Sequence, residues 1–313
     1  MCDQVAQTIQ DDMDIQLWFY KLITDPDLPD FPGKWRLKRY GKNLVSNRYY
    51  KVPYLSGWIW VCPVHAMGRQ VFEGGIYESV IIEIVRHFVR SQFSFVDIGA
   101  NIGLHTVAAA LEKVTNDQFF VAFEPEPINF SWLSRNCQTN SLFFVTYKQE
   151  ALGEKDDFLT LNISTTLNKG NHSLLARENT IPGKPTKVST LDTFFAGFPV
   201  APHNPVLIKL DAEGFEWPVL EGGKQFLERM NNVALICEIT PKTLAVFGKS
   251  VHDLQDRLKD AGFKKGAVLM DCDSFKVMEK TSNFYNMIFT KGVKSERVLQ
   301  CLQSGILYET VTL

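Results

Sequence analysis

The sequence has 313 residues, a formal net charge of −2 at pH 7 and an isoelectric point near 6.3. A chain so close to neutral lacks the basic surface typical of proteins that bind nucleic acids or anionic membranes, so neither partner class is expected. No apolar run approaches the ~18 residues that span a bilayer, and the N-terminus has no basic segment before an apolar stretch; both features predict a soluble cytoplasmic protein.

The first quarter of the chain is predicted to form an extension. Val5, Ile9, Met13 and Leu17 recur every four residues, which indicates a helix, and aromatic-rich short strands follow between residues 48 and 61. A further apolar helix over 77–89 leads into the main domain. We therefore expect an N-terminal extension at 1–77, which could cover a substrate, and one α/β domain at 78–313.

The main domain begins with a strand, a glycine turn and a helix. An apolar run at 93–96 ends in Asp97, passes Gly99 and Gly103, and enters a helix-forming segment from Val107. Asn101 stands where a dinucleotide fingerprint requires its middle glycine. A turn without that glycine but with a strand-end acid suits a ligand that has no phosphate and carries a positive amino group, such as S-adenosylmethionine (SAM). The alternative is a common turn without a ligand.

Two further units repeat this pattern along the chain. The strand 119–124 ends at Glu124, which lies 21 residues past Gly103, where an acid in a βαβ unit binds both ribose hydroxyls. A helix over 129–139 and a strand over 142–147 follow. Glu150 and the small Ala151 then come at the next strand end, where an adenine amino group could find an acceptor.

Later strands carry the candidates for catalysis. The strand beginning at 206 brings Lys209, Asp211 and Glu213, and the strand 233–238 ends at Glu238. Acids at adjacent strand ends could take the proton of an acceptor hydroxyl. The polar stretch 162–187 is predicted to be a long loop, and it contains His172 as a further candidate base.

Six cysteines are scattered along the chain without a Cys-x-x-Cys pair. Cys137 and Cys237 fall within the apolar patterns of a helix and a strand. This distribution predicts reduced core thiols, and neither a disulfide framework nor a zinc site.

Together these motifs resemble the FkbM family of SAM-dependent methyltransferases. The similar segments are Val96–Gly103, Phe123–Pro125, Glu150–Gly153, Ile208–Glu216, Val219–Gly223 and Cys237–Glu238. The resemblance implies a class I methyltransferase fold: a seven-stranded sheet of order 3-2-1-4-5-7-6, its last strand antiparallel, with helices on both faces. The predicted cofactor-binding residues are Glu78, Asp97, Gly99, Ala100, Asn101, Gly103, Thr106, Glu124, Pro125, Glu150, Ala151 and Asp211.

The expected reaction is transfer of the SAM methyl group to a hydroxyl of a small molecule or glycan. Asp211, Glu213 and Glu238 are the candidate bases, followed by Lys209 and His172. A metal-free base is favoured over a magnesium site. Two alternatives stay open: a catalytically silent SAM-fold binding or scaffold protein, and a nicotinamide-dependent oxidoreductase, against which the missing glycine argues.

Overall fold

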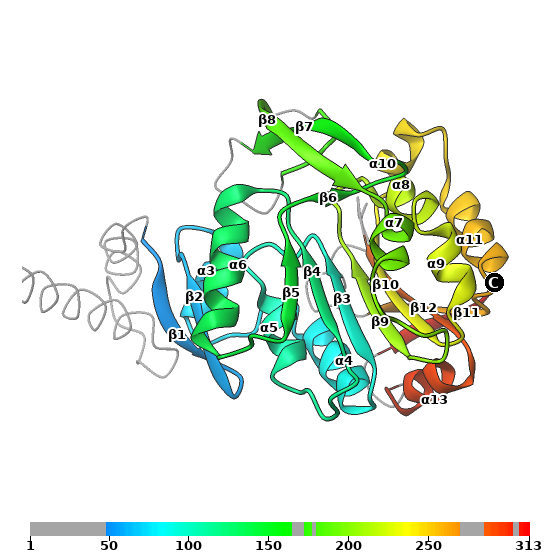
Figure 1. Ribbon diagram of the computed structural model, residues 1–313, viewed down its shortest axis with the longest axis horizontal. Helices are drawn as coiled ribbons and strands as arrows, with labels where there is room; N and C mark the ends of the chain where they lie inside the picture. The colour runs from blue at the N-terminus through cyan, green and yellow to red at the C-terminus, as the bar shows by residue number, and fades with distance from the viewer. Residues whose placement is uncertain (1–47, 165–171, 177–179, 270–284, 303–306) are drawn as a thin grey trace, which may run out of the picture. The chain divides into compact units, whose positions relative to one another are not determined.

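The computed structural model describes residues 48–164, 172–176, 180–269, 285–302 and 307–313 (Figure 1). The chain divides into two compact units, Met1–Tyr54 with Ile59–Tyr77, and Leu55–Trp58 with Glu78–Leu313. The predicted helix at 5–17 lies outside the described residues. The short strands predicted between 48 and 61 are present as β1 (Tyr50–Tyr54) and β2 (Gly57–Val61), which form a two-stranded sheet.

An eight-stranded sheet forms the centre of the second unit, in the order β13-β11-β12-β10-β9-β3-β4-β5. Its strands are β3 (Ser94–Ile98), β4 (Phe120–Phe123), β5 (Val145–Lys148), β9 (Val206–Leu210), β10 (Val233–Ile239), β11 (Lys265–Leu269), β12 (Tyr285–Lys291) and β13 (Leu307–Thr312). The five strands from β5 to β10 run parallel, and β12 pairs antiparallel with both of its neighbours.

The strand order is that of a class I methyltransferase with one strand added. Read from β5 to β11, the sheet has the predicted order 3-2-1-4-5-7-6 with the antiparallel strand in the predicted place. All seven predicted strands are present, and β13 adds an eighth by pairing antiparallel with β11 at the edge of the sheet. The sequence analysis included no strand at this position.

Helices cover both faces of the sheet. Within the described residues of the second unit the helices are α4 (Ser79–Arg90), α5 (Leu104–Ala110), α6 (Pro127–Thr139), α7 (Leu191–Ala196), α8 (Glu216–Glu221), α9 (Lys224–Arg229), α10 (Pro241–Val246), α11 (Val251–Asp260) and α13 (Val293–Leu302), and the first unit contains α3 (Ala66–Phe72). The helices α4, α5 and α13 pack together, and α5 lies against β3 and β4. Side chains of α7, α8, α9 and α11 join the sheet in one apolar core.

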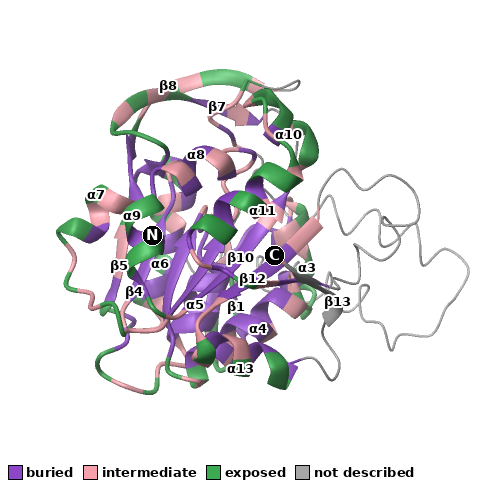
Figure 2. Ribbon diagram, turned by 90° about the vertical axis from the view of Figure 1, so that its right-hand side faces the viewer, coloured by how far each residue is buried: buried purple, intermediate pink, exposed green. Residues whose placement is uncertain are grey.

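Burial explains why these strands read as continuous apolar runs. Every residue of β3, β4 and β9 is buried, as expected for parallel strands with helices on both faces (Figure 2). Cys62, Cys137 and Cys237 are buried free thiols, whereas Cys301 is exposed. No helix in the described part of the chain combines the length and apolarity needed to cross a membrane.

A second, three-stranded sheet replaces much of the predicted loop. The strands β6 (Ala151–Leu152), β7 (Asp157–Ser164) and β8 (Thr180–Ser189) pair in the order β6-β8-β7. The expectation of a loop over 162–187 is therefore wrong at both ends, where residues 162–164 belong to β7 and 180–187 to β8. Most side chains of β7 and β8 stay at least partly exposed (Figure 2), so polar residues are tolerated in these strands. The pairing of β7 with β8 therefore forms despite the polar, proline-containing composition.

Candidate active site

The carboxyl ends of β3, β4, β9 and β10 meet at one edge of the main sheet. Asp97 on β3 is in register with Lys209 on β9, and the amide of Asp211 donates to the carbonyl of Ile98 at 3.1 Å. Acids that lie far apart in the sequence are thereby brought to one line of strand ends. Open α/β sheets bind their ligands at this edge.

The glycine turn after β3 is shaped by contact with the end of β9. Gly99 has φ +79°, and a Cβ at this position would lie 1.8 Å from the backbone oxygen of Asp211. A side chain at Gly99 would therefore clash first with the backbone of the chain itself. The amides of Gly99 and Ala100 both donate to the carbonyl of Phe123, which fixes the turn against β4.

Two further residues of the turn adopt positive φ angles. Asn101 has φ +52° and donates its amide to Glu124, and its side chain accepts from the amide of Ile102. Gly103, with φ +88°, is the N-cap of α5, and a Cβ there would lie 2.6 Å from Leu133 of α6. The second glycine thus permits close packing of α5 against α6.

Asp97 has one oxygen without a hydrogen-bond partner among the described residues. Its side chain is fully buried, and Oδ2 accepts from the hydroxyl of Thr106 at 2.6 Å. Oδ1 is buried and accepts no hydrogen bond within that part of the chain. A buried carboxylate oxygen without a donor is costly, so this atom is suited to receive a donor from a ligand.

Lys209 is a buried ammonium among carboxylates. Its Nζ lies 2.8 Å from Oδ2 of Asp211, and only 5% of its side chain is exposed. Burial by itself would lower the pKa of Lys209, but the charges of Asp211, Glu78 and Asp97 outweigh burial and raise it above its ordinary value. Lys209 therefore remains charged, and three carboxylates around one ammonium leave the cluster negative.

Glu78 joins this cluster from the N-cap of α4, with φ +48°. Its Oε2 lies 3.1 Å from Nε2 of His105, which is nearly buried at the start of α5. His105 follows the second glycine by two residues and was not among the predicted site residues. The contact fixes the position of Glu78 beside the glycine turn.

Glu124 at the end of β4 is held by backbone amides on both oxygens. Oε2 accepts from Asn101 at 2.7 Å and Oε1 from Glu126 at 2.9 Å. Burial raises the pKa of Glu124 to about 7, although these two hydrogen bonds lower it. Pro125, half-buried, follows directly and leads into α6.

Glu150, the predicted adenine acceptor, is buried beyond the end of β5. Its Oε2 is in contact with the ammonium of Lys187 and accepts from the hydroxyl of Ser189 at 3.1 Å. Ala151 is buried and opens β6, where it pairs in register with Val188 of β8. The second sheet is thus anchored at the carboxyl edge of the main sheet.

The loop from β9 to α8 is organised by Glu216. Its Oε1 accepts from the amides of Ala212 at 3.0 Å and Gly214 at 2.9 Å, and burial raises its pKa to about 7. Glu213 adopts φ +50°, and its carbonyl accepts from the hydroxyl of Ser173 at 2.7 Å. This loop therefore presents Asp211 and Glu213 in a fixed backbone conformation.

Glu238 lies at the end of β10 beside two other acids. Asp211, Glu216 and Glu238 each place a carboxylate oxygen within 4.8 Å of the others. Burial, together with the charges of Asp211, Glu216 and Glu213, raises the pKa of Glu238 well above its ordinary value. One of these carboxylates therefore tends to retain a proton near neutral pH.

A comparison with known families identifies the domain. The profile described as the methyltransferase FkbM domain matches residues 97–265, which is more than half of the chain. The chain belongs to the FkbM methyltransferase family. It is also 29% identical over 145 residues to Methyltransferase 1 of Beauveria bassiana (strain ARSEF 2860), in an alignment that covers 41% of this chain and 57% of that protein. The chain thus spans little more than half the length of this curated relative.

Solved structures give a weaker similarity. An FkbM methyltransferase from Methylobacillus flagellatus KT has a TM-score of 0.40 and 17% identity, covering 64% of this chain and 44% of that chain. TYW2 from M. jannaschii in complex with AdoMet has a TM-score of 0.40 and 10% identity, in an alignment that covers 79% of this chain and 86% of that chain. Both TM-scores lie below 0.5, so the class I fold of this FkbM domain rests on its own strand order.

SAM is the cofactor of this FkbM domain, and the residues at the carboxyl edge fit it. The unpartnered Oδ1 of Asp97 can accept from an ammonium donor, and the negative cluster around Lys209 favours a cation. Asp97, Glu124 and Glu150 follow one another at the ends of the neighbouring strands β3, β4 and β5. A ligand with an amino group, a ribose and an adenine can therefore extend along this edge.

His172 is placed near this edge but is used structurally. Its Nδ1 accepts from the amide of Ser164 at 3.1 Å. A neutral imidazole has one lone pair, so a ring that accepts through Nδ1 carries its proton on Nε2. Its neighbour Ser173 contacts Glu213, whereas Asn171 lies outside the described residues.

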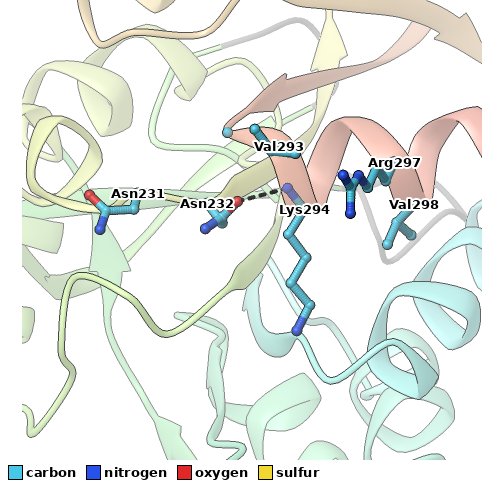
Figure 3. A pocket seen from close by; sticks show the side chains of 7 residues that line it. Asn231, Asn232, Val293, Lys294, Arg297 and Val298 are labelled. Atoms are coloured by element: carbon cyan, nitrogen blue, oxygen red, sulfur yellow. Dashed lines mark hydrogen bonds between the residues drawn. The ribbon is translucent and has the colours of Figure 1, made fainter.

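A shallow pocket lies at the opposite edge of the sheet (Figure 3). It is lined by Asn231, Asn232, Gly292, Val293, Lys294, Arg297 and Val298. Asn231 and Asn232 precede the first residue of β10, so this pocket lies at the amino end of that strand. It is therefore remote from the acids of the FkbM site.

Sequence reasoning missed three residues of this region. Glu216 stood in the quoted motif but received no role, although an acid two residues after Gly214 is placed to bind loop amides. His105 could have been suspected from its position in the glycine motif. Lys187 had no detectable signal, because only the pairing of β6 with β8 brings it to Glu150.

Proposed function

We propose that this protein transfers the methyl group of SAM to a hydroxyl of a small-molecule or glycan acceptor. The observation that carries the proposal is a group of three acids beside the edge that fits the cofactor: Asp211 and Glu238 at adjacent strand ends, and Glu216 at the start of α8. An aliphatic hydroxyl is a very weak acid, with a pKa comparable to that of bulk water, ~15.7. Its attack on the methyl group therefore needs a nearby proton acceptor. The carboxylate of Glu238, whose pKa is raised by burial, meets that need.

Each residue of the edge has a proposed part in binding. When bound, SAM supplies an electrophilic methyl group on a sulfonium. Asp97, Asp211 and Glu78 favour its positive amino-acid end, while Glu124 accepts from the ribose hydroxyls and Glu150 from the adenine. The turn from Gly99 to Gly103, which includes Ala100 and Asn101, brings its backbone close to the ligand. Thr106 contributes from the first turn of α5.

The acids differ in how well each could accept the proton of the acceptor hydroxyl. The ammonium of Lys209 lies 2.8 Å from Asp211, so it positions this carboxylate and is itself a poor proton acceptor. Among the described residues Glu238 forms no salt bridge, although the charge of Lys209 acts on it, and its raised pKa makes its ionised form the stronger base. Glu238 is therefore the preferred proton acceptor, with Asp211 and Glu213 next and His172 last.

That the N-terminal extension, residues 1–77, covers a substrate remains a prediction from the sequence. The cytoplasmic location remains a prediction. A silent SAM-binding scaffold would retain the cofactor edge but would not need the group of three acids. The nicotinamide alternative has no support, because the FkbM match describes a methyltransferase domain.

Cofactor binding is the first test. S-adenosylhomocysteine (SAH), the demethylated product, should raise the thermal unfolding midpoint, since a ligand that binds only the folded state adds about 2.7 kcal/mol at a hundredfold excess over Kd. Methyl-labelled SAM incubated with fractionated host extract should then mark the acceptor, identified by mass spectrometry. Well-folded protein that shows no shift with SAH would contradict the proposal; a shift without any labelled acceptor would favour the scaffold.

A further inference from the structure

The contact between Glu150 and β8 is set by strand register. Ala151 pairs with Val188 in the parallel pairing of β6 with β8, so the residues just before them, Glu150 and Lys187, lie side by side. Glu150 is 8% exposed in its side chain, whereas Lys187 is 56% exposed. The ammonium thus reaches from the surface to a buried carboxylate.

Both partners of Glu150 use the same oxygen. The ammonium of Lys187 and the hydroxyl of Ser189 contact Oε2. Within the described part of the chain, Oε1 makes no hydrogen bond. Two contacts on one oxygen fix the rotation of the carboxylate and leave the other oxygen to accept from a donor.

The place of Glu150 in the line of strand ends indicates that donor. Asp97, Glu124 and Glu150 lie at or just beyond the ends of β3, β4 and β5, and neighbouring strands are about 4.8 Å apart. A ligand whose amino-acid end lies at Asp97 and whose ribose lies at Glu124 reaches Glu150 with its base. The 6-amino group of adenine is a donor that requires an acceptor there.

We propose that Lys187, with Ser189, is a positioning residue for adenine recognition: it holds Glu150 so that Oε1 accepts from the 6-amino group. This inference rests on the proposed function, because it takes SAM as the ligand. A carboxylate buried without a cation is costly, and Lys187 offsets that cost while remaining largely in water itself. The sheet β6-β8-β7 thereby contributes to selectivity for the base.

The test compares two ligands and four proteins. The ligands are SAH and its analogue with hydrogen in place of the 6-amino group, titrated calorimetrically. The proteins are the wild type, Lys187→Met, Glu150→Gln and the control Lys184→Met. Lys184 is an exposed lysine on the same strand whose side chain makes no contact with Glu150.

The wild type should bind SAH at least about tenfold more tightly than the analogue, because the analogue cannot donate a hydrogen bond to the carboxylate of Glu150. Lys187→Met should reduce this ratio to about threefold or less, chiefly by weakening SAH, and Glu150→Gln should do the same. Lys184→Met should keep the wild-type ratio. A merely structural role of Lys187 would weaken both ligands equally and leave the ratio unchanged.

Three results would overturn the inference. The wild type could bind both ligands with equal affinity, Lys187→Met could keep the full ratio, or Lys184→Met could reduce it as much as Lys187→Met does. A wild type that binds neither ligand would instead overturn the proposed function. The two failures are therefore distinguishable.

Discussion

At the residue scale, the charge of the site depends on Lys209 and the carboxylates around it. A lysine with 5% of its side chain exposed is stable as an ammonium only where carboxylates surround it, and here Asp211 makes direct contact at 2.8 Å. Removing Asp211 would leave the buried ammonium of Lys209 without its direct partner. Asp211 thus combines a structural and a chemical task, whereas Glu238 is the cleaner residue on which to test catalysis.

Glu124→Ala should weaken SAH binding at least tenfold. The substitution removes an acceptor for ribose hydroxyls, and hydrogen bonds to charged groups are worth roughly 1.5–3 kcal/mol each. It also releases the amides of Asn101 and Glu126, so the glycine turn loses support. Isothermal titration calorimetry measures the affinity, with circular dichroism as the control for folding. An unchanged affinity would show that Glu124 does not face the ribose.

Glu238→Gln should lower methyl transfer at least a hundredfold while SAH affinity changes little. Loss of a proton acceptor typically costs roughly 10²–10⁴ in rate. Transfer from labelled SAM to the acceptor fraction measures the effect, and Asp211→Asn should also reduce turnover, with added loss of stability from the unpaired Lys209. If neither substitution slows transfer, the base lies elsewhere, and His172 becomes the next residue to test.

The same assay distinguishes a base from a metal. The oxygens of Asp211, Glu216 and Glu238 are close enough to hold a cation, but one oxygen of Asp211 is bound to Lys209 and one of Glu216 to two amides. We expect turnover to survive EDTA. Loss of turnover in EDTA and recovery with magnesium would instead assign these acids to a metal.

At the scale of elements, the glycine turn and the end of β9 depend on each other. The backbone oxygen of Asp211 occupies the volume that a side chain at Gly99 would need. The same carbonyl belongs to the residue that contacts Lys209. A shift of one element therefore displaces the other, and both belong to the cofactor edge.

Gly99→Ala should destabilise the protein strongly and abolish SAH binding. A Cβ at 1.8 Å from a backbone oxygen forces the turn to move, in addition to roughly 1–3 kcal/mol of backbone strain at φ +79°. Gly248→Ala is the matched control, because Gly248 has φ +66° but no atom within 4 Å of the added Cβ. Thermal unfolding midpoints compare the two. Equal losses would show that strain alone, and not the contact with Asp211, explains the glycine.

At the scale of the whole molecule, the buried acids make stability depend on pH. The pKa of Glu216 rises from 4.5 to about 7 on folding, so the folded chain binds more protons than the unfolded chain in that interval. The contribution to stability is fully present below 4.5 and is lost as the pH rises through about 7. A shift of this size corresponds to about 3 kcal/mol, as an order of magnitude.

Glu216→Gln should therefore reduce the loss of stability between about pH 5 and about pH 8, by a few kcal/mol at most. Glutamine still offers an oxygen to the amides of Ala212 and Gly214 but does not ionise. The exposed Glu154→Gln serves as the control and should leave the pH dependence unchanged. Urea unfolding at the two pH values measures both. A variant with the full wild-type pH dependence would show that Glu216 is already ionised at neutral pH.

The sequence by itself determined the architecture of the main sheet. Parallel strands buried on both faces read as apolar runs, and strand-end acids and glycines mark their carboxyl ends, so β3, β4, β9 and β10 were predictable from local pattern. The family followed from the same motifs. The second sheet was not predictable, because β7 and β8 are partly exposed and polar.

Only the tertiary structure decided which of the predicted residues act together. Sequence spacing places Asp97, Lys209 and Asp211 at strand ends, but the register between β3 and β9 makes one charge cluster of them. The reach of Lys187 to Glu150 and the closure of Gly99 against Asp211 depend on contacts between segments more than thirty residues apart. Local patterns fix how each segment folds, whereas burial and the pairing of distant strands determine the charges and hydrogen bonds of the site.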